Sequence, residues 1–136
     1  MRKRLCIGLV LVATSIGFGV AHGIAPFIEK GADNGIRYMT GGVGSNERAA
    51  MEEMAEEYTL KLVCALNTGE YLTQIHVVVR EPDGEILLNT LSNGPLFFAD
   101  LPRGRYGITV TYRNQRKFRE VEVGGGLKTI FFHLKP

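Results

Sequence analysis

Apolar and polar residues alternate with two different periods along this chain. Within residues 45–57, apolar side chains recur at the spacing of one helical face and four glutamates lie opposite. The apolar side chains are Ala50, Met51, Met54 and Ala55. From residue 58 onward apolar and polar residues alternate one by one, as they do in half-buried strands. The pattern predicts one short helix, capped by Ser45 or Asn46, and a β-domain over residues 58–136.

The β-domain contains short alternating segments separated by clusters of Pro, Gly, Asn and Asp. The predicted strands are residues 58–66, 74–81, 86–89, 96–99, 106–112, 117–123 and 129–134. No helical pattern falls between them, which favours an all-β fold, a seven-stranded antiparallel β-sandwich. The residues expected to face inward are Ile75, Val77, Val79, Tyr106, Ile108, Val110, Tyr112, Ile130, Phe132 and Leu134.

Residues 1–23 have the order of a secretory signal peptide. A basic start is followed by an apolar stretch, and small residues then predict cleavage after Ala21 or Gly23. The alternative is a membrane anchor, but the apolar stretch is interrupted by Thr, Ser and Gly and falls short of the roughly 20 residues that span a bilayer. We therefore expect a periplasmic or secreted protein, which contacts a membrane only if the signal segment stays uncleaved.

Residues 24–44, between the signal and the helix, contain five glycines and no clear periodicity, which predicts a flexible leader. The leader ends in Gly41-Gly-Val-Gly44, and backbone N–H groups ahead of a helix attract anions such as phosphate. However, no predicted strand precedes these glycines, no Gly-Lys-Ser/Thr follows them, and Glu47 would repel an anion. A plain hinge is therefore the favoured interpretation.

The overall charge changes once the signal is removed. The chain has 16 basic and 14 acidic residues, and removing the three basic residues of the signal leaves 13 against 14. The net charge of the remaining chain is then about −1, so the basic balance of the whole chain comes from its start. This composition does not indicate binding to nucleic acid.

The cysteines indicate neither a disulfide nor a nucleophile. Cys6 leaves with the signal, so Cys64 is the remaining thiol and has no partner within the chain. It alternates with Tyr58, Leu60, Leu62 and Leu66 on one face of a predicted strand. A cysteine on an apolar inward face behaves as a small buried hydrophobe, and we expect Cys64 to be inert.

The other reactive residue types do not form a catalytic or metal-binding pattern. His76 and His133 fall on the outward phases of their strands, with no further ligand at a suitable spacing. The nearest paired carboxylates are neighbours on the helix, which is typical of a solvated face rather than of a general acid and base. We therefore predict no catalytic residue, no metal and no cofactor, and a protein that is not an enzyme.

Residues 77–84 and 94–110 carry a resemblance to a known family. The second stretch contains Leu101-Pro-Arg-Gly-Arg-Tyr106 between two strands. Over residues 58–134 the chain resembles the carboxypeptidase regulatory-like domains, which implies a transthyretin-like (prealbumin-like) β-sandwich. With the segment ahead of it, the chain is also similar to small exported bacterial proteins. From the residues themselves, Pro102 fixes the turn, and Tyr106 packs inward while its hydroxyl bonds nearby backbone.

Two alternatives on the same fold are less favoured. Transthyretin-like hydrolases end in Tyr-Arg-Gly-Ser, whereas this chain ends in Phe131-Phe-His-Leu-Lys-Pro136, and Tyr112-Arg113 is an internal coincidence at a hairpin. Small-molecule or glycan binding is the first alternative, although sugar sites usually stack sugars on exposed aromatics. This chain has no Trp, and most of its Tyr and Phe fall on inward positions.

Charge segregation is the remaining functional signal. A candidate interaction surface, expected at one end of the sandwich, comprises Arg103, Arg105, Arg113, Arg116, Lys117 and Arg119. The alternative is an ordinary soluble surface on which basic and acidic residues are interspersed. Outward apolar residues Val78, Phe97 and Phe131 are expected to lie under the helix. The sequence thus favours a non-catalytic exported binding or structural module that contacts an unknown protein or envelope component.

Overall fold

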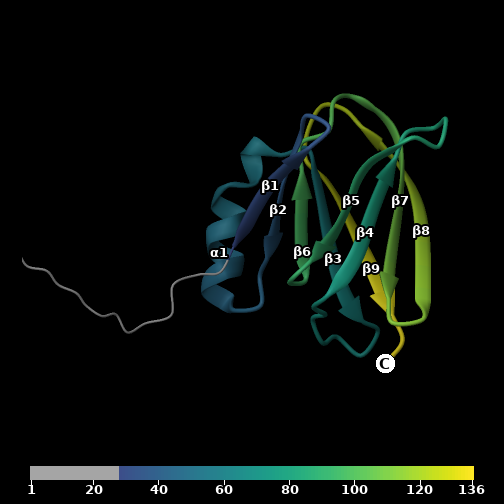
Figure 1. The fold of residues 1–136 in the computed structure, drawn as a ribbon. Helices are drawn as coiled ribbons and strands as arrows, with labels where there is room; N and C mark the ends of the chain where they lie inside the picture. Colours follow the sequence, from purple (N-terminus) through teal and green to yellow (C-terminus); the bar gives the residue numbers. More distant parts are fainter. Residues whose placement is uncertain (1–27) are drawn as a thin grey trace, which may run out of the picture.

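The computed structural model describes residues 28–136, so the predicted signal peptide lies outside the described part of the chain. These residues form two packed β-sheets with one α-helix and one short 3₁₀ helix (Figure 1). In chain order the elements are β1 (Glu29–Asp33), β2 (Ile36–Gly41), α1 (Ser45–Glu53), η1 (Ala55–Glu57), β3 (Leu60–Leu66), β4 (Ile75–Arg80), β5 (Ile86–Ser92), β6 (Leu96–Ala99), β7 (Gly104–Tyr112), β8 (Gln115–Val123) and β9 (Lys128–Leu134).

The strands divide between sheet A, in the order β1-β2-β6-β3-β9, and sheet B, in the order β5-β4-β7-β8. The predicted β-sandwich is confirmed as a class, but it has nine strands within residues 28–136 and not seven. It is also not wholly antiparallel, because β9 runs parallel to β3. After β8 the chain crosses from the edge of sheet B to the edge of sheet A through three consecutive glycines, and this crossing sets the direction of β9.

The interior between the sheets contains the residues that the alternation assigned to it. All ten predicted inward residues are buried there except Tyr112, which is partly buried against the same cluster. Tyr106 is 6% exposed, and its hydroxyl donates a 2.6 Å hydrogen bond to the Pro102 carbonyl. This bond anchors the turn before β7 to the strand that follows it, as predicted.

The predicted flexible leader is wrong for residues 29–41, which form the β1–β2 hairpin of sheet A. Its turn is Asn34-Gly35, and both residues have positive φ angles of 51° and 77°. Asn-Gly is a strong signal for a two-residue hairpin turn, and it was available in the sequence. The many glycines nearby hid the short alternation that runs from Ile36 to Thr40.

The helix packs on the outer face of sheet A, on the left of Figure 1. Met51 is fully buried there, with Met54 and Ala55 partly buried beside it, while Glu52 and Glu53 face outward. The predicted helix over residues 45–57 is too long, since α1 ends at Glu53 and a 3₁₀ turn follows. No basic residue lies in its last turn and glutamates follow it, so the helix dipole opposes continuation.

The residues under the helix are not the ones expected. They are Met39, Tyr58, Val63, Leu96 and Phe98, whereas Phe97 points into the interior between the sheets. Both faces of sheet A are covered at β6, so this all-apolar strand shows no alternation from which its phase can be read. Phe131 stays 54% exposed, and Val78 lies on the other sheet. Among residues 28–136 no helix has the length and apolar character needed to cross a membrane.

Candidate binding face

The outer face of sheet B is formed by cross-strand rows of side chains that no helix covers, since α1 lies against sheet A. Taken in the order β5, β4, β7, β8, the rows are Leu91, His76, Thr111, Arg116; then Asn89, Val78, Thr109, Phe118; then Ile86, Arg80, Gly107, Glu120. These rows enclose a shallow hollow of about 490 Å³. We call this surface the sheet B face.

Phe118 is the most exposed large apolar side chain of the sheet B face, at 62%. Its ring leans over Gly107 on the neighbouring strand, because a Cβ placed there would come within 2.9 Å of the ring atom Cε1. Gly107 therefore leaves room for the ring to lie against the backbone of β7. The result is an aromatic surface that faces outward and is held in place from below.

Two arginines lie on either side of this aromatic surface. Arg80 and Arg116 occupy the rows on each side of the row that contains Phe118. Neither takes part in an ion pair among the described residues. Asn89 lies in the same row as Phe118, and its Oδ1 forms a short hydrogen bond with Nε2 of His76 in the neighbouring row. The face thus combines an exposed ring with two arginines that form no ion pair and one carboxylate, that of Glu120. The excess of positive charge suits an anionic partner that has an apolar part.

The six predicted basic residues do not gather at one end. Arg103 and Arg105 lie at the start of β7, and Arg113 lies in the turn after its end, roughly 30 Å away for a strand of nine residues. Arg116 is on the sheet B face, whereas Lys117 and Arg119 point to the side between β8 and β9. Strand length and alternation separate residues that are close in sequence. Their role in an interaction stays a prediction.

The predicted hinge at Gly41-Gly-Val-Gly44 is held by a glutamate. The Glu47 carboxylate accepts hydrogen bonds from the N–H groups of Gly42 and Val43, at 3.3 and 3.0 Å. Gly44, rather than Ser45 or Asn46, is the N-cap of α1. The anion that these backbone groups attract is therefore a side chain of the protein itself, placed one turn into the helix.

Cys64 and the histidines have the surroundings that the strand phases predict. Cys64 is buried between the sheets, and desolvation raises the pKa of its thiol to about 12. A thiol that remains protonated is a poor nucleophile. His76 and His133 are exposed on outward phases, and the ring of His133 stacks on that of Phe131 at 6.4 Å.

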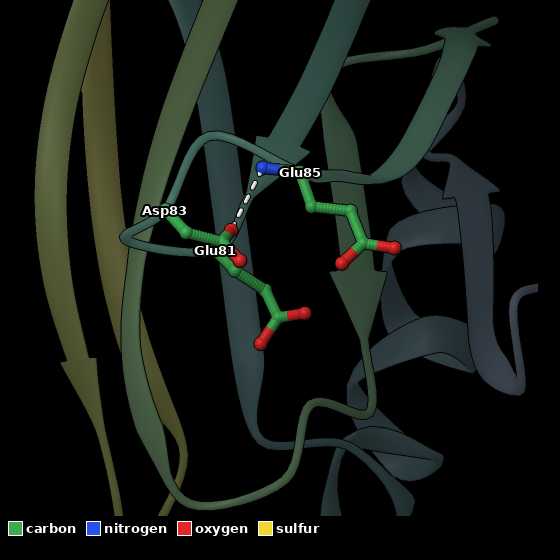
Figure 2. A group of neighbouring side chains, drawn as sticks. All are labelled: Glu81, Asp83 and Glu85. Atoms are coloured by element: carbon green, nitrogen blue, oxygen red, sulfur yellow. Dashed lines mark hydrogen bonds between the residues drawn. The ribbon is translucent and has the colours of Figure 1, made fainter.

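The β4–β5 turn brings three carboxylates together, which the sequence interpretation missed. Glu81, Asp83 and Glu85 place carboxylate oxygens within 4.8 Å of one another (Figure 2). Their alternate spacing around Pro82-Asp83-Gly84 was the available signal. Asp83 Oδ1 accepts the Glu85 N–H at 2.9 Å, and the Gly84 N–H donates to the Glu81 carbonyl at 2.8 Å. These bonds are those of a tight turn, and they account for Asp83 and Gly84 without a metal.

Comparisons with known proteins give no family for this chain. No protein-family model, curated protein or solved structure matches it. The sheet B face must therefore be interpreted from its own chemistry. Phe118 and Arg80 were not among the predicted site residues. For Phe118, its position at the centre of a charged strand was the signal that it faces outward.

Proposed function

We propose that this protein is a non-catalytic binding module that uses the sheet B face to hold an acidic partner protein. The observation that carries the proposal is the exposed ring of Phe118 between the unpaired guanidinium groups of Arg80 and Arg116. An exposed aromatic group flanked by arginines is typical of the residues that dominate protein interfaces. The partner we infer has Asp or Glu side chains around an apolar contact.

Export and family are further parts of this proposal. The basic and apolar start of residues 1–23 supports export, and N-terminal sequencing of the isolated protein should find His22 or Ile24 as its first residue. The bond from the Tyr106 hydroxyl to the Pro102 carbonyl supports a carboxypeptidase regulatory-like, transthyretin-like domain, because that turn carries the resemblance. An intact Met1 would favour a membrane anchor instead.

An anionic glycan is the second candidate partner. The Thr109 and Thr111 side chains lie on the same face as the Phe118 ring, so hydroxyl groups surround an exposed aromatic surface. The face of an aromatic ring is negatively polarised and attracts C–H groups of the kind that a sugar presents. The same arginines would then bind a sugar carboxylate.

The test is photo-crosslinking from the sheet B face in the producing cells. A photoreactive phenylalanine analogue at Phe118 should give a discrete protein adduct, whereas the same analogue at Glu53 on α1 should give none. The double variant Arg80→Glu/Arg116→Glu should reduce the adduct about tenfold or more, and added salt should weaken it, because the contact is electrostatic. Adducts that appear equally from both positions, or that survive the charge reversal, would overturn the proposal.

A glycan partner is distinguished by the material that is crosslinked. An adduct that is removed by glycosidase treatment, and that still depends on Arg80 and Arg116, would replace the protein partner with the second candidate.

A further inference from the structure

The two sheets have four edge strands in the described chain, and three of them are protected. β1 carries Glu29, Lys30 and Asp33, and β8 carries five charged side chains. The free edge of β9 is closed by side chains of β8. Gln115 exchanges hydrogen bonds of 2.6 and 2.7 Å with the backbone of Lys135, and Arg119 donates to the Phe131 carbonyl at 3.4 Å. Charges of this kind prevent edge strands from pairing with other chains.

β5 is the exception. Its seven residues, Ile-Leu-Leu-Asn-Thr-Leu-Ser, contain no charge and no proline, and Leu91 is 48% exposed. Asn34 donates a 2.9 Å hydrogen bond to the Leu87 carbonyl at the free edge. The Glu81 N–H donates to the Glu85 carbonyl at 2.9 Å, so alternation along β4 directs the backbone groups of Val79 and Val77 toward β5. Their partners Leu88 and Thr90 face β4, and the N–H and C=O groups of Asn89 and Leu91 therefore point to the free edge. Within residues 28–136 these groups have no partner.

β1 runs beside this edge, on the side of sheet A. β2 faces β5 across the sandwich, and β1, the next strand of sheet A, therefore projects past β5. Two contacts fix its ends along β5: the Asn34 bond to Leu87, and a 3.4 Å hydrogen bond from the Asn93 amide to Glu29. The edge of β5 and the inward face of β1 thus lie on the same side of the molecule.

The inward face of β1 has two acidic residues, one on each side of a glycine. Gly31 lies in the middle of β1, and the Tyr38 side chain lies so close that a Cβ on Gly31 would come 2.5 Å from its hydroxyl oxygen. Tyr38 packs against the interior, so Gly31 shares its face of the sheet. Alternation places Glu29 and Asp33 on that same face, one on each side of Gly31. A strand placed beside β5 would therefore have two carboxylates opposite its inward side chains.

The geometry selects a single strand over a second copy of the protein. Suppose that two copies paired through β5. The β1 strand of each copy projects past its own β5, so it would lie under the β5 of the other copy, where β2 of that copy already lies. A single extended segment brings no second sheet with it and avoids this clash.

We propose that β5 is a docking edge for an extended peptide segment of a partner protein, with apolar side chains outward and lysine or arginine side chains inward. The backbone groups of Asn89 and Leu91 would supply the pairing, as in other cases of strand addition to a sheet edge. Glu29 and Asp33 would select the positive charges. This edge uses the backbone of Asn89 and Leu91, whose side chains lie on the sheet B face, but it does not use Phe118, Arg80 or Arg116. It also prefers the opposite sign of charge, so each proposal can fail without the other.

The test uses two blocked octapeptides, one of alternating Lys and Val and one of alternating Glu and Val, added to the purified protein. We expect the Lys peptide to bind about tenfold or more tightly than the Glu peptide. We also expect it to slow hydrogen exchange of the Asn89 and Leu91 amides, while Phe118→Ala leaves the binding unchanged. Asn89→Pro should abolish the binding, because it removes an edge N–H that makes no bond within the sheet.

A second variant keeps the test independent of the effect of proline on folding. Glu29→Lys/Asp33→Lys changes exposed side chains, and it should reverse the preference between the two peptides. Equal binding of both peptides, or binding that survives Asn89→Pro, would overturn the proposal. So would edge amides that are already protected in the free protein: protection at all dilutions indicates occupancy by the protein's own chain, and protection that grows with concentration indicates a second copy.

Discussion

The outer faces of sheets A and B have the same kind of apolar positions, but their exposure differs where α1 covers sheet A. On sheet A, Met39 and Phe98 are fully buried beneath Met51 of α1. On sheet B, Phe118 stands in an equivalent outward position and is 62% exposed. The difference lies in the cover and not in the strands. An outward apolar residue contributes to stability where a helix covers it and is available for binding where none does.

The covered face and its helix depend on each other. α1 has only nine residues, which is too short for a helix to be stable alone in water, so its apolar contacts with sheet A hold it in place. An ion pair between Lys61 of β3 and Glu52 adds a contact at the margin. The sheet B face has no such dependence, so its side chains can change without unfolding the protein.

The largest change in stability is expected when α1 is released from the outer face of sheet A. Met51→Asp/Met54→Asp should lower the free energy of unfolding by about 5 kcal/mol or more, since it loses apolar burial and places a carboxylate in an apolar site. The uncovered Met39 and Phe98 should then cause self-association. Chemical denaturation and light scattering measure both effects, with Glu53→Ala as the control. A monomeric variant of normal stability would mean that sheet A does not need its helix.

Substitutions in the interior between the two sheets provide a reference for the size of these stability changes. Tyr106→Ala should cost about 3–5 kcal/mol, which is the usual cost of removing a large buried aromatic side chain. Tyr106→Phe should cost only about 1 kcal/mol, because it removes one hydrogen bond, that to the Pro102 carbonyl. Urea denaturation of the two variants tests this difference. If Tyr106→Ala proved neutral, the inward phase of β7 would be wrong.

The burial of Cys64 in the same interior makes the free energy of unfolding depend on pH. Its pKa is raised from 9.0 to about 12 in the folded protein, so above pH 9 the unfolded chain loses a proton that the folded protein keeps. The contribution of the protonated Cys64 thiol to the free energy of unfolding is complete below pH 9 and falls as the pH rises toward 12. The loss should reach about 1.4 kcal/mol at pH 10. Urea midpoints at pH 7 and pH 10 should show it in the wild type, and the loss should be smaller by that amount in Cys64→Ala.

The smallest effect on stability is expected on the open face. Phe118→Ala should change the free energy of unfolding by no more than about 0.5 kcal/mol, because the side chain is mostly in water already. Thermal or urea denaturation against wild type is sufficient to measure this. A loss as large as that of a buried aromatic residue would show that a second copy or another part of the chain covers the sheet B face.

Much of the fold could be predicted locally. Most of strands β3 to β9 follow from alternation between turn residues, although β5 continues to Ser92, three residues past its predicted end, and β6 has no alternation. The burial of Tyr106 and Cys64 follows from their phases. The β1–β2 hairpin could also have been predicted from its Asn34-Gly35 turn, but the other glycines nearby suggested a flexible segment. The sheet B face was not predicted, because the basic residues were grouped by sequence position and strand β7 then separates them.

The sequence by itself determined the strand class, the turns and the inward set, because period and turn chemistry act between near neighbours in the chain. Only the tertiary structure decided which outward faces are covered. The phase of Phe97 and Phe98, the exposure of Phe118 and the open edge of β5 all depend on where α1 and β1 lie, and those placements join residues far apart in sequence. Alternation distinguishes two faces of a strand, but only packing determines what, if anything, lies against each.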